Sequence, residues 1–190
     1  MNKVAVIGAP SSVGARHAGQ EHAPELFRRQ GPIENLRNTG LDVLDKGVLP
    51  MVSYQPDIDH PQRQNLALVS AVARQVSDRI YNTVQANVNL LVLGGDCTIT
   101  LGVLAGMSRH FPNIGLNYFD GDVDLNTPAD TPSGVFDGMV MAHIIGEGAV
   151  ELTHISPRHP LMPQEKIILF GYNSNAGCID TAEIERLEQY

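Results

Sequence analysis

The sequence predicts an α/β fold of three layers, in which helices cover both faces of a mainly parallel β-sheet. Short apolar runs that end in glycine or polar residues alternate along the chain with longer segments whose apolar residues recur at helical spacing. This alternation is typical of βαβ units, whose consecutive strands are parallel. The 190 residues include 43% hydrophobic and 18% charged residues, a balance that suits one globular domain spanning residues 1–190.

The apolar runs are short, and loop-forming sequence follows each of them, which predicts buried strands. The predicted strands are residues 3–8, 41–44, 88–93, 114–119 and 166–170. Residues 64–85 are predicted to form a long amphipathic helix, because their apolar side chains recur every three or four positions. These side chains are Leu66, Val69, Val72, Val76, Ile80 and Val84. Further helices are predicted at residues 23–30, 98–110, 139–146 and 181–188.

The net charge limits which partners the protein is expected to bind, and the cysteine content indicates the compartment in which it is expected to occur. The formal net charge is -8 and no basic cluster offsets it, which argues against nucleic acid as a main partner. No apolar run approaches the length needed to cross a membrane, so we expect no membrane partner. Cys97 and Cys178 are the only cysteines, too few for a disulfide framework. They therefore favour a reducing compartment, and we expect a cytoplasmic protein.

An acidic run, Asp120-Gly121-Asp122-Val123-Asp124, follows the strand predicted at residues 114–119. Ligands of parallel sheets bind at the carboxyl ends of the strands. If the run is extended, its three carboxylates leave on one face and repel each other unless they are protonated or neutralised by a cation. Carboxylate oxygens suit a hard divalent cation. The alternative is a solvated loop in which the carboxylates diverge and cap turns.

The residues around the acidic run limit what it can bind. A calcium loop of the EF-hand type is excluded, because Leu125 replaces the required turn glycine and Thr131 replaces the glutamate ligand. Asn126 and Ser133 follow in a polar loop and are able to hydrogen-bond a ligand held beside a metal, although both residue types also favour turns. A second predicted strand ends in a polar loop that contains Cys97.

Taken in order, four segments of the chain resemble the ureohydrolase family, which includes arginase, agmatinase and formiminoglutamase. The matching segments are Ile7-Gly8-Ala9-Pro10, Ala23-Pro24-Glu25-Leu26-Phe27-Arg28, Gly94-Gly95-Asp96-Cys97, and the acidic run with its continuation to Ser133-Gly134. The resemblance implies an arginase-like fold, a homo-oligomer, and hydrolysis of a guanidino or formimino C–N bond by two manganese ions. It also implies that Asp120 and Asp124 are metal ligands and that Asn126 and Ser133 bind an amino-acid-like substrate.

Three positions depart from the family pattern, each where the family has a histidine: Cys97, Asp122 and Asp137. Asp122 keeps an oxygen ligand, whereas a cysteine ligand suits zinc or iron better than manganese. Cys97 is also open to interpretation as a buried packing residue or as a nucleophile activated by the following helix. Asp137 takes the place of the histidine that shuttles protons. The predicted site therefore comprises four metal ligands (Cys97, Asp120, Asp122, Asp124), a catalytic Asp137, and substrate-binding Asn126 and Ser133.

A further departure concerns the later D-x-D motif that supplies the family's remaining metal ligands, because the chain contains no match to it. We therefore expect an arginase-like fold that is incomplete toward its C-terminus. Two functions stay open. One is a metal-dependent hydrolase of a linear amidine or guanidino C–N bond, with manganese as the expected cofactor and zinc, iron or magnesium as alternatives. The other is a non-catalytic binding or regulatory protein whose metal site has decayed.

Overall fold

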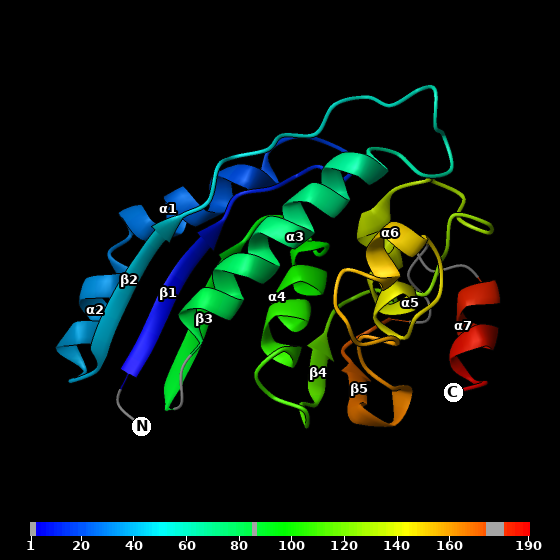
Figure 1. The fold of residues 1–190 in the computed structure, drawn as a ribbon. Helices are drawn as coiled ribbons and strands as arrows, with labels where there is room; N and C mark the ends of the chain where they lie inside the picture. Colours follow the sequence, from blue (N-terminus) through cyan, green and yellow to red (C-terminus); the bar gives the residue numbers. More distant parts are fainter. Residues whose placement is uncertain (1–2, 85–86, 174–180) are drawn as a thin grey trace.

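The computed structural model describes residues 3–84, 87–173 and 181–190, and its helices and strands alternate as the sequence predicts (Figure 1). The strands are β1 (Lys3–Ala9), β2 (Asp42–Val48), β3 (Val88–Gly94), β4 (Leu116–Phe119) and β5 (Ile167–Phe170). The α-helices are α1 (Ala23–Arg29), α2 (Pro32–Asn38), α3 (Leu66–Thr83), α4 (Ile99–Ser108), α5 (Val140–Ile144), α6 (Val150–Thr153) and α7 (Thr181–Leu187). Short 3₁₀-helices are η1 (Gln20–His22), η2 (Phe136–Met139) and η3 (Gln164–Lys166).

Every strand ladder within the described residues is parallel, which confirms the predicted parallel sheet. β1 lies between β2 and β3, with Lys3 aligned to Asp42 on one side and to Val88 on the other. β4 and β5 form a second ladder, in which Leu116 is aligned to Ile167. All five strands therefore have their carboxyl ends on the same side of the molecule in Figure 1.

Alternate residues of β1 pack into two different hydrophobic clusters, because successive side chains of a strand point to opposite faces. Val4 and Val6 pack with Ile33 and Leu36 of α2. Ile7 belongs to the larger cluster that contains the buried face of α3. Figure 1 shows α3 and α4 covering one face of this sheet while α1 and α2 lie on the other. The predicted three-layer arrangement is confirmed.

The amphipathic helix predicted at residues 64–85 is observed as α3, and its apolar stripe is buried against α4. Two glycines of α4 make this close packing possible. A Cβ atom at Gly102 would overlap the Ala73 carbonyl oxygen, and one at Gly106 would meet the Ser77 carbonyl oxygen at 2.5 Å. None of the helices in the described part of the chain is long and apolar enough to cross a membrane.

Some elements differ from the prediction for local reasons. The sequence gives no apolar signal for α2, which exposes most of its surface and begins with Pro32, a residue suited to the first turn of a helix. β2 extends four residues beyond the predicted end at 44, and its outer half is largely exposed. The helix predicted at 139–146 is observed as η2 followed by α5. The helix α5 ends at Ile144, shortly before Gly146, whose backbone φ is 93°.

Gly95 allows the loop after β3 to pack directly on the loop after β1, and this contact fixes where Cys97 lies. The Asp96 N–H donates to the Ser11 carbonyl at 2.9 Å, and a Cβ atom at Gly95 would overlap that carbonyl. The Ser11 hydroxyl and the Gly14 N–H both donate to the buried Asp96 carboxylate, at 3.0 and 3.2 Å.

We therefore expect Gly95→Ala to lower the free energy of unfolding by about 1–3 kcal/mol, as overpacking of a closed interior contact does. Urea unfolding monitored by circular dichroism measures this change. Gly121→Ala is the matched control, because a Cβ atom there meets nothing within 4 Å and the backbone φ is not positive. Equal stability of the two variants would contradict the tight contact at Gly95.

Candidate metal centre

The acidic run is a folded loop that brings its first and last carboxylates together, and it is not an extended strand. Asp124 has a left-handed backbone with φ of 53°. The Asp120 carboxylate accepts the Asp122 N–H at 3.1 Å, and the Asp122 carboxylate accepts the Val123 N–H at 3.0 Å. These local hydrogen bonds turn the chain, so the Asp122 carboxylate does not join those of Asp120 and Asp124.

Cys97, Asp120 and Asp124 form a group in which one ligand atom of each residue lies within 4.8 Å of the others. Cys97 follows β3 and the two aspartates follow β4, so the group forms where the carboxyl ends of two parallel strands face each other. The Cys97 thiol lies 3.8 Å from Asp120 Oδ2. Asp122 lines the same chamber but is outside the group, and its role as a ligand stays a prediction.

Burial and repulsion from nearby carboxylates favour the protonated forms of Asp124 and Cys97 when no cation is present. Burial of Asp124, which is 4% exposed, raises the pKa of its carboxyl to about 8, and Asp120, Asp122 and Asp137 add repulsion. A hydrogen bond of 2.6 Å from the Tyr118 hydroxyl acts in the opposite direction. Burial, with the nearby carboxylates of Asp137 and Asp124, also raises the pKa of the Cys97 thiol.

The raised thiol pKa bears on the three interpretations of Cys97. An activated cysteine nucleophile needs a lowered pKa, so this environment does not support that interpretation. The thiol is half-buried and lies beside two carboxylates, and Cys97 also packs against the larger hydrophobic cluster, so the packing interpretation stays open. A bound cation would favour the ionised thiolate and carboxylates instead of their protonated forms, because its positive charge stabilises both kinds of anion together. The donor set of one sulfur and two carboxylates fits a divalent cation.

Asp137 lies in η2 and contacts the loop after β3 at Cys97. Its carboxylate accepts the Cys97 N–H at 2.9 Å, and its own N–H donates to the Gly14 carbonyl at 2.9 Å. Burial raises the pKa of the Asp137 carboxyl, and this effect exceeds the opposing effect of the Cys97 N–H. Asp137 also lines the chamber, so it is able to hold a proton within reach of a bound ligand.

The group opens into a chamber of about 730 Å³, which the other predicted site residues also line. Asn126 and Ser133 lie in its wall, as the sequence predicts. Two further contributors were not predicted. One is the loop after β1, residues 15–20, and the other is Glu183 of α7, whose carboxylate accepts the Leu125 N–H at 3.1 Å. The loop follows the segment Ile7-Gly8-Ala9-Pro10 that resembles the family, whereas Glu183 comes from a part of the sequence that carries no motif for the chamber.

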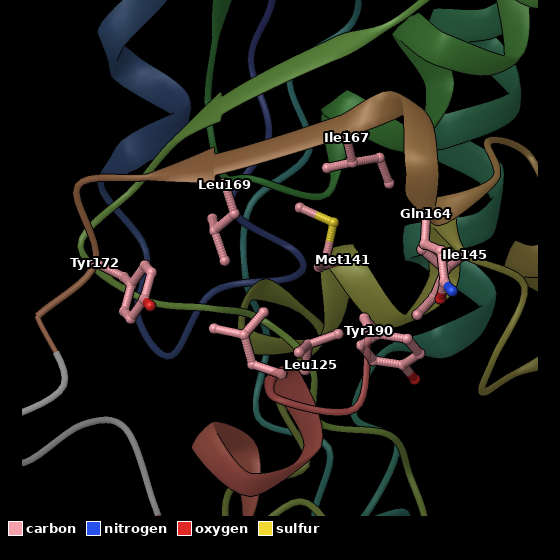
Figure 2. Close-up of a pocket in the computed structure, with 9 residues that line it drawn as sticks. Leu125, Met141, Ile145, Gln164, Ile167, Leu169, Tyr172 and Tyr190 are labelled. Atoms are coloured by element: carbon pink, nitrogen blue, oxygen red, sulfur yellow. The ribbon is translucent and has the colours of Figure 1, made fainter.

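A separate apolar cavity of about 260 Å³ lies on the other side of the acidic loop, between β5, α5 and α7 (Figure 2). Figure 2 shows Ile167 and Leu169 pointing from β5 into this cavity, opposite Leu125. Leu125 is 1% exposed and follows Asp124 directly. No acidic side chain is among the described residues that line this cavity.

His143 is outside the chamber and is held by hydrogen bonds at both ring nitrogens. Nδ1 donates to the Met139 carbonyl at 2.7 Å and Nε2 accepts the Ala149 N–H at 3.0 Å. Burial lowers the pKa of His143, in keeping with a neutral ring that connects α5 to the following loop. Its role is therefore structural. Cys178 lies outside the described residues.

Comparisons with known proteins agree on one family. The profile of the arginase family matches residues 2–188. An arginase of Staphylococcus aureus (strain COL) is 32% identical over 169 residues, and an arginase of Bacillus caldovelox is 31% identical over 176 residues. These alignments cover 87% and 92% of this chain, but 55% and 59% of the relatives.

Solved structures give the same result. The arginase of Bacillus cereus superposes with a TM-score of 0.87 at 28% identity, and that of Entamoeba histolytica, crystallised with L-ornithine, with 0.86 at 29% identity. Both matches cover 100% of this chain and 62% or 63% of the solved chain. The chain thus spans rather less than two thirds of the length of the relatives it matches.

Proposed function

We propose that this chain, which belongs to the arginase family, carries the metal centre of a ureohydrolase-type enzyme that cleaves a C–N bond of a linear guanidino or amidino compound. The observation that carries this proposal is the group formed by Cys97, Asp120 and Asp124 at the strand ends, open to the large chamber. The expected location in the cytoplasm, the single domain and the homo-oligomer stay predictions from the sequence.

In this proposal Asp120, Asp124 and Cys97 hold a divalent cation. When bound, such a cation makes hydroxide available at neutral pH and polarises the carbon under attack. Manganese and magnesium suit the two carboxylates, and zinc or iron suits the thiolate. The Tyr118 hydroxyl, 2.6 Å from Asp124 Oδ2, orients that carboxylate for binding.

The remaining chamber residues bind the substrate and carry protons. Asp137 has a raised pKa and lines the chamber, which suits a group that accepts a proton and returns it to the leaving nitrogen. Asn126 and Ser133 hydrogen-bond the polar part of the substrate. The acidic wall also favours a cationic guanidinium group, because carboxylates, which carry the opposite charge, line the chamber.

A non-catalytic binding protein is the second candidate. It is supported by the small number of ligands, because the described residues place three ligand atoms together and leave Asp122 outside the group. An incomplete metal site would still present an acidic chamber for a cationic ligand. The two candidates differ in whether metal uptake leads to hydrolysis.

The test equilibrates the protein with Mn²⁺ or Zn²⁺, removes excess metal by gel filtration, and measures metal content and urea or ammonia release from guanidino and formimino compounds. We expect retained metal and turnover in the wild type, and loss of both in Asp124→Ala. Metal retention without turnover of any compound would favour the binding protein. A protein that retains no metal would rule out the proposed hydrolase.

A further inference from the structure

Helix α7 holds both backbone polar groups of Leu125, the residue between the proposed metal ligand Asp124 and the proposed substrate-binding Asn126. The Glu183 carboxylate accepts the Leu125 N–H at 3.1 Å, and Arg186 Nη1 donates to the Leu125 carbonyl at 2.7 Å. The first hydrogen bond fixes the peptide group that joins Leu125 to Asp124. The second fixes the peptide group that joins Leu125 to Asn126.

The side chain of Leu125 is enclosed as well. It is 1% exposed and lines the apolar cavity, to which Leu187 of α7 also contributes (Figure 2). One short helix therefore contacts the residue after Asp124 at its N–H and its carbonyl, and lines the cavity that contains its side chain. These contacts leave the acidic loop little freedom to rotate at its last carboxylate.

Asp124 depends on such support because its backbone conformation is uncommon. Its φ of 53° lies in the left-handed region, where residues other than glycine are seldom found unless surrounding contacts hold them. The Asp124 carbonyl accepts the Ala142 N–H of α5 at 3.1 Å, so the peptide group that leads to Leu125 is held at both ends, by Ala142 and by Glu183. Release at either end would let the backbone relax and turn the Asp124 carboxylate away from the other members of the metal group.

Arg186 is itself held by two carboxylates. It forms ion pairs with Asp130, at 3.1 Å, and with Glu147, and its side chain is 21% exposed. The Thr127 hydroxyl donates to Asp130 at 2.8 Å, and the Tyr190 hydroxyl donates to Glu147 at 2.7 Å. The network joins α7 to the polar loop after the acidic run and to the loop after α5. Because partly exposed ion pairs contribute little to overall stability, its loss is expected to change local geometry more than the fold.

We propose that Glu183 and Arg186 are positioning residues, which hold Asp124 in the orientation that joins it to Cys97 and Asp120 at the metal group. They act through the backbone of Leu125, and neither is a member of the three-residue group found among the described residues. This inference rests on the metal binding in the proposed function, but it does not require that the bound metal hydrolyses a substrate.

The test titrates the full chain with Co²⁺ and measures its dissociation constant and its visible absorption bands. Glu183→Ala and Arg186→Met are expected to weaken Co²⁺ binding by at least about 10-fold, as loss of groups that orient metal ligands does. Both variants should also alter the visible bands, because the coordination geometry changes, while the charge-transfer band of the Cys97 thiolate persists.

Conservative variants and a matched control separate positioning from a general loss of structure. Glu183→Gln and Arg186→Lys should restore part of the affinity, because each keeps an acceptor or a donor for Leu125. Glu185→Gln is the control, since Glu185 is exposed on the same helix and should leave Co²⁺ binding unchanged. Circular dichroism checks that each variant is folded. Arg186 is partly exposed, so Arg186→Met decides the test if loss of the buried Glu183 carboxylate prevents folding.

The outcomes distinguish this inference from the proposed hydrolase. Wild-type affinity in Glu183→Ala and Arg186→Met would overturn the positioning role, even in a protein that hydrolyses guanidino compounds. Weaker binding with unchanged visible bands, or with no recovery in the conservative variants, would also overturn it. Weaker and spectrally altered binding in a protein that releases no urea or ammonia would support the positioning role while the proposed hydrolysis fails. A wild type that binds no Co²⁺ would overturn both.

Discussion

Raising the pH from 5 to 8 is expected to destabilise the metal-free protein by up to about 4 kcal/mol through Asp124 alone. The pKa of the Asp124 carboxyl is about 8 in the folded protein, against an ordinary value of 3.8. The folded state therefore holds a proton that the unfolded state has released. Stability from this group is fully present below pH 4, declines through the intervening range, and is lost as the pH rises through 8.

Urea unfolding at pH 5, 6, 7 and 8 in the presence of a chelator measures this effect. Asp124→Asn is the matched control, because its amide resembles the protonated carboxyl in shape and does not titrate. The difference between wild type and variant isolates Asp124 from Asp137, whose raised pKa acts in the same direction. A difference that does not change with pH would show that the buried carboxyl keeps an ordinary pKa. Added divalent metal is expected to restore stability at pH 8, since it binds the ionised form.

Much of the fold follows from patterns that the sequence displays locally. β1, β3 and α3 have strong apolar periodicity, and their positions are close to those predicted. By contrast, α2 buries none of its seven residues fully, so the sequence shows no amphipathic stripe from which this helix could be predicted. Its helical form depends on Pro32 at the first turn and on the packing of Ile33 and Leu36 against β1.

The candidate site was predictable where it depends on strand ends. Cys97 and Asp120 meet because parallel strands place their carboxyl ends together, and this rule requires no knowledge of the structure. The position of Asp122 was harder to predict, because the left-handed backbone at Asp124 and local hydrogen bonds replace the expected alternation. The loop of residues 15–20 joins the site through long-range packing, for which the sequence carries no periodic signal.

Replacing Cys97 with serine is expected to change which metal the centre prefers. Thiolate is a soft ligand that favours zinc over manganese. The carboxylates of Asp120 and Asp124 bind manganese about as well as they bind zinc. Loss of residues that merely support metal ligands commonly costs 10–100-fold in affinity, so loss of the thiolate should weaken Zn²⁺ binding by at least about 100-fold. Mn²⁺ binding should weaken by less than about 10-fold, because serine keeps an oxygen at the same position.

Competition titrations with a metal-sensitive dye measure both dissociation constants in wild type and Cys97→Ser. Asp122→Asn is the control, since this acid lines the same chamber outside the three-residue group and should alter the two metals alike. The raised pKa of the Cys97 thiol adds a second signature, because Zn²⁺ must displace its proton and should bind more tightly as the pH rises. If Cys97→Ser weakened Zn²⁺ and Mn²⁺ equally, and the pH dependence were unchanged, the thiol would not be a ligand. The centre would then depend on Asp120 and Asp124, and the preference for zinc would have no structural basis in this chain.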